Sequence, residues 1–343
     1  MKRRFSKSSQ VMRQRQRDFL GRNADLCARS LRAAAMLSAA PARAACPLCG
    51  TASPGRADFS HRGAPYCTCR ACGHIASVGD PARLPQDPDR YANVYPRLEP
   101  EELAIRVRDI YLPKLDWVLD VCESELGIPP SRLLARPWLE IGSGEGLFLK
   151  ALELRGATRF TGLGVDGAML ARSRELLGEE RVKTLTGPLG EAVAASGAGV
   201  VAAWFVFEHL CDLDDLARAL SGLPAGTILC FAVPVYSLSV LLEAACEAHY
   251  PRTLDGEVHT QLFTDASIAY FLSRCGCTMA GEWVFGQDAS DLGRLLEVVT
   301  DARGGPAAAR GLLDAFGRAV EDLQAVIDRH MLADSRHIVA VRA

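Results

Sequence analysis

The sequence predicts an α/β fold in which a doubly wound parallel sheet follows a small cysteine-rich module. Three observations support this prediction. Short β-rich apolar runs alternate with helical stretches from Pro137 onward. The first of these runs ends in a glycine-rich turn, and two Cys-x-x-Cys-Gly motifs precede the alternation. Regular alternation of strands and helices is typical of a parallel sheet covered by helices on both faces.

The alternating segment contains five expected strands in succession. They are residues 138–144, 159–166, 181–187, 199–207 and 227–235. Helical stretches extend from the first two strands to Arg155 and Leu177. A helix over 265–275 then leads to a sixth strand at 277–286, and the last strand is expected at 337–342.

Composition and turn residues divide the chain into four parts. Residues 1–45 are expected to be a basic flexible tail or an exposed basic helix, and residues 46–80 a metal-binding module. Residues 81–132 form a proline-punctuated linker with a helix over 101–126, and residues 133–343 form the main domain with a helical insertion at about 288–333. Apolar side chains on one face of the second inserted helix are expected to pack in the core. They are Leu312, Leu313, Phe316, Val320, Leu323, Val326 and Ile327.

Charge and cysteine usage limit the classes of protein that fit. Residues 1–45 hold eleven Lys or Arg against two Asp, whereas the remainder carries a net charge of about −11. Seven cysteines lie scattered in apolar or helical segments, which is typical of buried free thiols in a reducing compartment. No run approaches the ~18 apolar residues of a membrane span. We therefore expect a cytoplasmic enzyme without a membrane anchor.

The glycine turn predicts a site for a nucleotide-like ligand. Residues 139–146 read LEIGSGEG, and the apolar run LFLKALEL follows. Glycines let the backbone approach a ligand closely, and the start of the next helix offers unpaired N–H groups. The spacing is G-x-G-x-G, and Leu147 stands where a dinucleotide fingerprint requires its third glycine. Glu140 suits the ammonium of S-adenosylmethionine (SAM) better than it suits a pyrophosphate.

On these residues the segment from Trp138 to Pro234 resembles the class I SAM-dependent methyltransferases, which have a Rossmann-like sheet. The resemblance implies that Glu140, Gly142, Ser143, Gly144 and Gly146 form the cofactor loop. It also implies that an acid after the second strand holds the ribose hydroxyls, a role we assign to Asp166, with helix capping as the alternative. The resemblance covers about residues 133–290 and the last strand, and it implies that this strand is antiparallel.

The end of the fourth strand, WFVFEHL, resembles the segment that lines the adenine and methyl-donor side of the pocket in that family. We carry this role over to Phe207, Glu208 and His209. A histidine can accept a proton near neutral pH, so His209 is the candidate general base or acceptor-orienting group. Tyr236 and His259 are the alternatives for that role.

The two Cys-x-x-Cys-Gly motifs predict a small zinc ribbon. Cys46 and Cys49 form the first pair, and Cys69 and Cys72 form the second after nineteen intervening residues. This spacing is typical of a four-thiolate structural zinc site. Cys67 and His74 are rival ligands, and a redox Cys-x-x-Cys pair is the weaker alternative.

Zinc modules precede SAM-binding domains in two groups of methyltransferases. One resembles small-molecule methyltransferases of sugar and natural-product biosynthesis, and the other resembles ribosomal-RNA methyltransferases. The basic tail favours RNA, but the acidic remainder and the lack of interleaved aromatic and basic residues in the module favour a small-molecule acceptor. A non-catalytic zinc interaction protein is a third reading. The acceptor pocket is expected within residues 234–263. Its candidates are Tyr236, Glu243, His249, Tyr250, Asp255 and His259.

Overall fold

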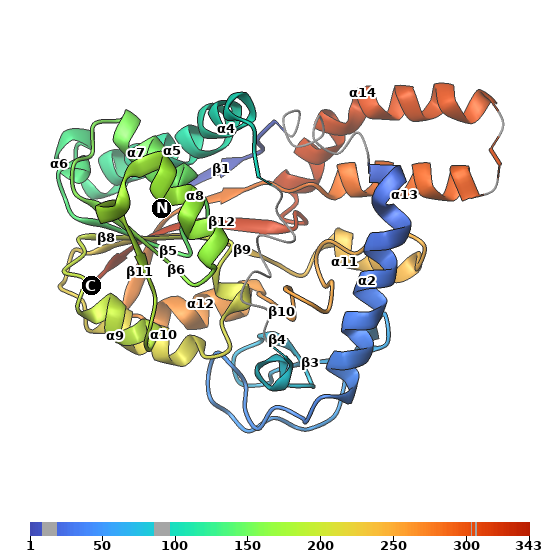
Figure 1. Ribbon diagram of the computed structural model, residues 1–343, viewed down its shortest axis with the longest axis horizontal. Helices are drawn as coiled ribbons and strands as arrows, with labels where there is room; N and C mark the ends of the chain where they lie inside the picture. Colours follow the sequence, from blue (N-terminus) through green and yellow to red (C-terminus); the bar gives the residue numbers. More distant parts are fainter. Residues whose placement is uncertain (9–18, 86–96, 303, 306) are drawn as a thin grey trace.

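A computed structural model of the chain describes residues 1–8, 19–85, 97–302, 304–305 and 307–343. Residues 9–18 of the expected tail and 86–96 of the expected linker lie outside these described residues. The described chain contains one eight-stranded sheet with the order β1-β11-β12-β9-β8-β5-β6-β7, and a four-stranded sheet with the order β10-β4-β3-β2. The large sheet runs through the middle of the molecule, and the small sheet lies at one side of it (Figure 1).

The large sheet confirms the predicted α/β class. Its parallel strands are β5 (Trp138–Ile141), β6 (Phe160–Gly164), β7 (Val182–Thr184), β8 (Val200–Trp204) and β9 (Ile228–Pro234). The expected last strand is β12 (Ser335–Arg342), which runs antiparallel to both β9 and β11 (Cys277–Val284). The carboxyl ends of the parallel strands therefore share one edge, where ligands of such sheets bind.

Helices cover both faces of this sheet, as Figure 1 shows. On one face lie α4 (Pro100–Arg106), the π-helical turn η2 (Val107–Tyr111), α5 (Leu112–Leu126), α6 (Pro130–Leu134), α7 (Leu147–Leu154) and α8 (Gly167–Leu177). On the other lie α9 (Leu189–Ala194), α10 (Leu213–Ser221) and α12 (Asp265–Arg274). Alternate residues of the strands belong to two separate apolar cores, one on each face of the sheet. Trp138 packs in the core beneath α5 and α7, and Leu139 packs in the core beneath α10 and α12. The first face also buries Glu140, which is 3% exposed.

The cysteine module is a small antiparallel sheet that is completed by the main domain. It comprises β2 (Phe59–His61), β3 (Ala64–Thr68) and β4 (Ile75–Ser77). The fourth strand is β10 (Gln261–Leu262), which pairs with β4. Because one strand of this sheet comes from the main domain, the module is attached to that domain by backbone hydrogen bonds as well as by side chains.

Two parts of the expected basic tail belong to the folded body, so the tail prediction is wrong for them. Strand β1 (Lys2–Phe5) pairs in parallel with β11 at the edge of the large sheet. Arg3 Nε donates to Glu282 Oε2 at 2.9 Å, and Lys2 Nζ donates to Asp120 Oδ1 at 2.7 Å. Four residues are too few to show a strand period, and basic side chains are common on sheet edges.

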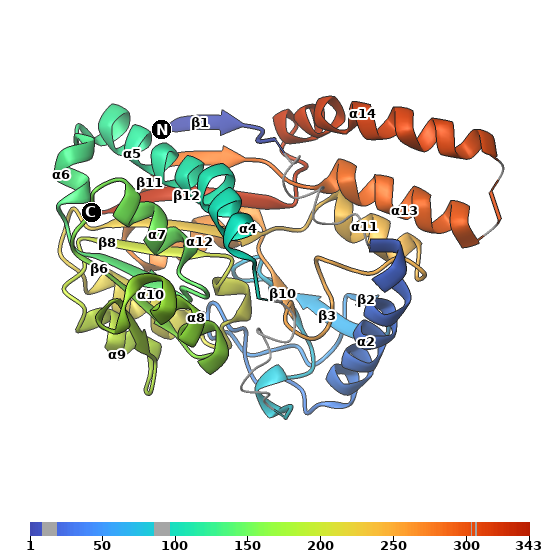
Figure 2. The same ribbon diagram turned by 45° about the horizontal axis from the view of Figure 1, so that its top comes forward.

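Helix α2 (Phe19–Ala39) is the second correction to the tail. Its buried residues recur at helical spacing but are mostly small or polar, so they form no apolar stripe in the sequence. They are Asn23, Cys27, Ser30, Ala33, Ala34 and Leu37. Ser30 Oγ donates to the carbonyl of Asp255 at 2.8 Å. The helix therefore packs on the loop that precedes β10 and on the small sheet, as Figure 2 shows.

The expected apolar face of the second inserted helix is only partly buried. The insertion forms α13 (Asp288–Ala302) and α14 (Ala307–Arg329), which pack on each other and project from the body (Figure 2). Val320 is 3% exposed, whereas Leu312 is 72% exposed and Val326 46% exposed. A single neighbouring helix covers only a narrow stripe, so the prediction of a fully packed face is wrong. No helix in the described part of the chain is long and apolar enough to cross a bilayer.

Helix α2 yields a prediction with a matched control. Ala34→Arg places a long cation at a buried position, where the backbone of Ala34 lies close to Gly256. We expect this variant to lose about 1–3 kcal/mol of unfolding free energy. Ala35→Arg adds the same charge at the next, exposed position and should leave stability unchanged. Urea unfolding of both variants measures the difference, and equal stability of the two would show that α2 is not docked.

Candidate active site and cysteine cluster

The glycine loop joins β5 to α7 at the carboxyl edge of the sheet. Gly142, Gly144 and Gly146 all have positive φ, at +66°, +52° and +79°. A Cβ on Gly142 would lie 2.5 Å from a methyl of Val206, and one on Gly146 would lie 2.4 Å from Ser173 Oγ. These two positions therefore require glycine for packing as well as for backbone conformation.

Gly144 differs from its two neighbours because its surroundings are open. A Cβ there would meet only the methyl carbon of Met169, at 3.6 Å. Gly146 is the N-cap of α7, so the loop delivers the chain to a helix N-terminus with its unpaired N–H groups. Ser143 is 6% exposed, and its Oγ has no hydrogen-bond partner in the described structure. This arrangement leaves the middle of the loop as the place where a ligand can approach.

Glu140 lies beneath this loop as a buried carboxyl group. Its Oε2 has no hydrogen-bond partner, and burial raises the pKa of the carboxyl well above its usual value. Lys114 acts in the opposite direction and favours the ionised form of Glu140. A buried acceptor without a donor is the feature that a ligand's ammonium group can satisfy.

Lys114 is a site residue that the sequence analysis missed. It projects from α5, is 5% exposed, and its Nζ lies 5.1 Å from the ring centroids of both Trp204 and Phe205. Tyr111 provides a third ring at 5.4 Å. Burial lowers the pKa of Lys114 well below its usual value, while Glu140 and Glu208 raise it. Only the tertiary fold brings this helix to the loop, so no local sequence signal marks the residue.

Asp166 caps α8, which is the alternative role that the sequence analysis gave it. Its Oδ1 accepts from Met169 N at 2.9 Å, and the residue is 5% exposed. Phe207 lies in the core, where its ring packs 5.1 Å from both Phe231 and Phe271. The structure thus places Phe207 among core side chains and does not show it as a pocket-lining ring.

Glu208, His209 and His259 come together after β8. Glu208 and His209 lie in the 3-10 helix η4 (Phe207–His209), and His259 lies two residues before β10. One potential ligand atom from each residue lies within 4.8 Å of the other two, and the imidazole rings stack with centroids 5.1 Å apart. Glu208 is fully buried without a hydrogen-bond partner, and burial raises its pKa to about 8.

The third catalytic candidate, Tyr236, lies outside this group. It is 41% exposed, and its ring packs edge-on against Phe59 of the small sheet at 6.0 Å. Glu243 and His249, two further candidates for the acceptor pocket, are buried beside α11 (Leu238–Ala245) and the loop that follows. There Glu243 accepts from the backbone N–H groups of Arg252 and Thr253 at 2.7 and 2.9 Å. These contacts give Glu243 a structural role.

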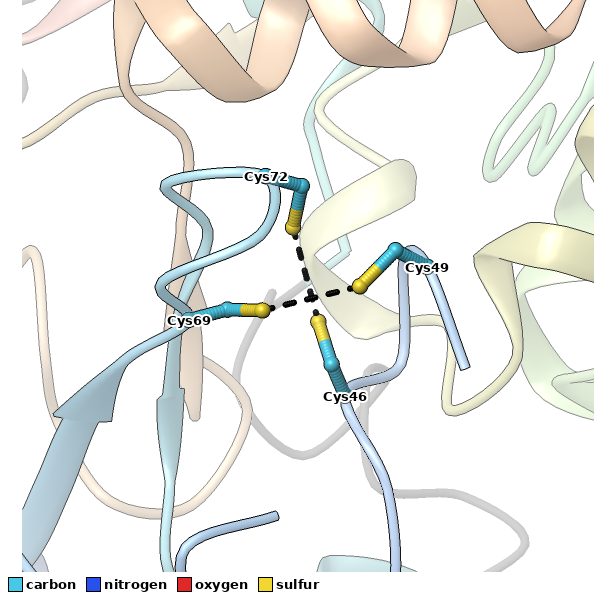
Figure 3. A group of neighbouring side chains, drawn as sticks. All are labelled: Cys46, Cys49, Cys69 and Cys72. Carbon is cyan, nitrogen blue, oxygen red and sulfur yellow. Dashed lines mark hydrogen bonds between the residues drawn. The ribbon is translucent and has the colours of Figure 1, made fainter. Parts of the chain in front are cut away.

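The four cysteines of the two motifs converge on one point, as Figure 3 shows. Cys46 Sγ lies 3.7 Å from Cys72 Sγ, and Cys49 Sγ lies 3.5 Å from Cys69 Sγ. Four sulfurs about 2.3 Å from a tetrahedral ion are separated by about 3.8 Å, so the observed spacing suits such an ion. The neighbouring Cys72 thiol lowers the pKa of Cys46 to about 5.

The two rival ligands lie outside the cluster. Cys67 is a buried thiol and is not among the four converging sulfurs. His74 is 1% exposed, and its Nε2 lies 3.0 Å from Gln261 Oε1. The cluster therefore consists of the four cysteines of the paired motifs.

The comparison with known families assigns the region that contains the loop and η4. The model of a methyltransferase domain matches residues 139–224, about a quarter of the chain. Residues 139–224 therefore carry a methyltransferase domain, and the chain is an enzyme, a methyltransferase. A comparison with curated proteins found no match.

Three solved structures with a similar chain path are distant in sequence. A proposed sarcosine dimethylglycine methyltransferase from Galdieria sulphuraria is 14% identical over 75% of this chain and 99% of its own, with a TM-score of 0.46. Geranyl diphosphate C-methyltransferase from Streptomyces coelicolor A3(2) is 15% identical over 75% and 88%, with a TM-score of 0.41. Coclaurine N-methyltransferase is 13% identical over 66% and 71%, with a TM-score of 0.40.

The burial of Lys114 predicts that its replacement raises the unfolding free energy by an amount that depends on pH. Since its pKa is lower in the folded chain than in the unfolded chain, the folded chain binds fewer protons and becomes more stable as the pH rises. Lys114→Met removes the buried amine and should stabilise the ligand-free protein by about 1–3 kcal/mol at pH 6 and by less at pH 9. Thermal unfolding at the two pH values tests this. A loss of stability at both would mean that the three rings and the carboxylates more than compensate for desolvation.

Proposed function

We propose that this protein transfers the methyl group of SAM to a small-molecule acceptor at the carboxyl edge of the large sheet. The observation that carries the proposal is the burial of Lys114 against the rings of Trp204 and Phe205, which lie just before η4. There Lys114 interacts electrostatically with both Glu140 and Glu208. The cofactor loop and the candidate acceptor-activating group thus belong to one site. The sugar or natural-product type of acceptor is part of the proposal.

Glu140 and the three glycines fit the methionine end of SAM. The unpaired Oε2 of Glu140 can accept from the SAM ammonium, and Gly144 lies in the open middle of the loop. Asp166 is assigned to the ribose hydroxyls, although one of its oxygens already caps α8. When bound, SAM supplies an electrophilic methyl group, and the chain supplies binding, orientation and a place for the acceptor's proton.

The cofactor assignment predicts different effects for two substitutions at one position. Gly144→Arg should abolish binding of S-adenosylhomocysteine, because the long side chain fills the open side of the loop. Gly144→Ala carries the same strain at positive φ but little volume, and it should retain measurable affinity. Calorimetry with S-adenosylhomocysteine, together with unfolding curves of both variants, separates lost binding from lost folding. Unchanged affinity in Gly144→Arg would contradict this loop assignment.

His209 is suited to accept the acceptor's proton. Its Nδ1 lies 2.8 Å from the carbonyl oxygen of Val258. A carbonyl oxygen only accepts, so Nδ1 carries the hydrogen, and in the neutral ring Nε2 keeps the lone pair. The acceptor atom attacks the methyl carbon, the sulfur–methyl bond breaks, and the acceptor's proton passes to Nε2 of His209.

The base assignment predicts a large loss of turnover in one variant. With an acceptor identified by screening small hydroxyl and amine compounds, His209→Ala should lower turnover by about 10²–10⁴-fold and leave SAM affinity nearly unchanged. The remaining activity should lose its pH dependence near neutrality. Tyr236→Phe serves as the control and should retain turnover. Full activity of His209→Ala would transfer the role to His259 or to an acceptor that needs no base.

The four cysteines are assigned to a structural zinc ion. Four thiolate ligands leave this ion no open coordination position, so it takes no part in the reaction. We expect about one zinc per chain in elemental analysis, because a closed four-thiolate site holds a single ion. Cys46→Ser should release the ion and loosen residues 46–78, whereas Cys67→Ser, outside the cluster, should retain it. Native protein without metal would contradict the assignment.

A further inference from the structure

Three hydrogen-bond acceptors converge in the group of Glu208, His209 and His259. The Nδ1 atoms of His209 and His259 lie 2.8 and 2.9 Å from the carbonyl oxygens of Val258 and Arg252. Both carbonyl oxygens can only accept, so each Nδ1 carries a hydrogen, and each neutral ring has its lone pair on Nε2. Backbone carbonyls orient metal-binding histidines in the same way.

Glu208 adds a carboxylate that no protein donor satisfies. The residue is fully buried, and neither of its oxygens has a hydrogen-bond partner. Oε1 lies 4.0 Å from Nε2 of His209, which is too long for a shared proton. The group therefore places two imidazole nitrogens and one carboxylate oxygen within 4.8 Å of one another. Both histidines are partly exposed, so this group is reachable from outside.

We propose that Glu208, His209 and His259 bind a divalent first-row transition-metal ion that holds an oxygen of the acceptor. Two imidazoles and one carboxylate are a ligand set for such ions and leave coordination positions open. The site rests on the proposed function, because it lies beside the glycine loop and would act on the same acceptor. It is separate from the cysteine cluster, whose four thiolates close the coordination of their ion.

The ion gives the acceptor a second route to deprotonation. A hydroxyl oxygen bound to a divalent ion loses its proton more easily, and that proton passes to water. The oxygen then attacks the methyl carbon of SAM, the sulfur–methyl bond breaks, and S-adenosylhomocysteine and the methyl ether leave. One nitrogen cannot hold a proton and a metal ion together. His209 is therefore a ligand in the metal-loaded enzyme and a base only in the metal-free enzyme.

Manganese binding to the full-length protein tests this proposal without an acceptor. The protein is first treated with a mild chelating resin, and the zinc that remains is counted. Titration with Mn²⁺ in the presence of S-adenosylhomocysteine, followed by the spin-resonance signal of free Mn²⁺, should show one additional site. Glu208→Gln and His259→Ala should each weaken it at least tenfold with zinc binding unchanged. His330→Ala removes an exposed histidine elsewhere and should have no effect.

The outcomes separate this proposal from the proposed function. Absence of a Mn²⁺ site, or equal affinity in wild type and both variants, overturns the metal site. Methyl transfer that is unaffected by Mn²⁺ and by Glu208→Gln overturns its role in the reaction and leaves the base role of His209 intact. If Mn²⁺ stimulates methyl transfer and Glu208→Gln removes this stimulation, both the metal site and the proposed function are supported. A bound ion without methyl transfer to any screened compound supports the site and contradicts the proposed function.

Discussion

The side-chain amide of Gln261 joins the cysteine module to the short helix that carries Glu208 and His209. Its Nε2 donates to the carbonyls of Phe207 and Leu210 at 3.3 and 2.7 Å. Its Oε1 lies 3.0 Å from Nε2 of His74, which follows the second cysteine pair by two residues. The residue is 1% exposed, so these bonds are made where water cannot replace them.

This connection gives the cysteine module a defined place in the site. The module is joined directly to the main domain, since β10 of that domain completes its sheet. Thr264 Oγ1 donates to the carbonyl of Gly73 at 3.0 Å, and Leu213 N donates to the carbonyl of Pro47 at 2.8 Å. An ion in the module would therefore stabilise both the small sheet and the position of η4. A separate RNA-gripping appendage would not need these bonds.

Buried ionisable groups gather around Lys114. Glu140 and Glu208 are buried without hydrogen-bond partners, and Lys114 is buried among aromatic rings. His337 on β12 adds a fully buried imidazole with neither nitrogen bonded, stacked 4.2 Å from Phe285. Such groups cost stability in the ligand-free protein and cluster where binding or catalysis uses them.

The sequence was sufficient to predict the elements that depend on local pattern. Alternating strands and helices, the glycine loop and the paired cysteines each follow from residue spacing, and the structure contains all three. The structure also brings His209 and His259 together. These features can be predicted locally, because a turn, a strand or a Cys-x-x-Cys-Gly motif is specified within a few consecutive residues.

The elements that the sequence did not reveal depend on distant contacts. Helix α2 buries small and polar side chains, which carry no amphipathic signal, and β1 is too short to show a period. Lys114 and Gln261 acquire their roles only when α5 and β10 reach the carboxyl edge of the sheet. Phe207 was assigned to a pocket from its neighbours in sequence, but its ring packs with Phe231 in the core.

Hydrogen exchange of η4 tests whether the cysteine module holds the segment that carries Glu208 and His209. The amides of His209 and Leu210 donate to the carbonyls of Val206 and Phe207 at 3.0 and 3.2 Å. After treatment with a chelator that strips metal from the cysteine cluster, we expect faster exchange at these amides and unchanged exchange in α7. Faster exchange confined to residues 46–78, with η4 as protected as before, would contradict this expectation.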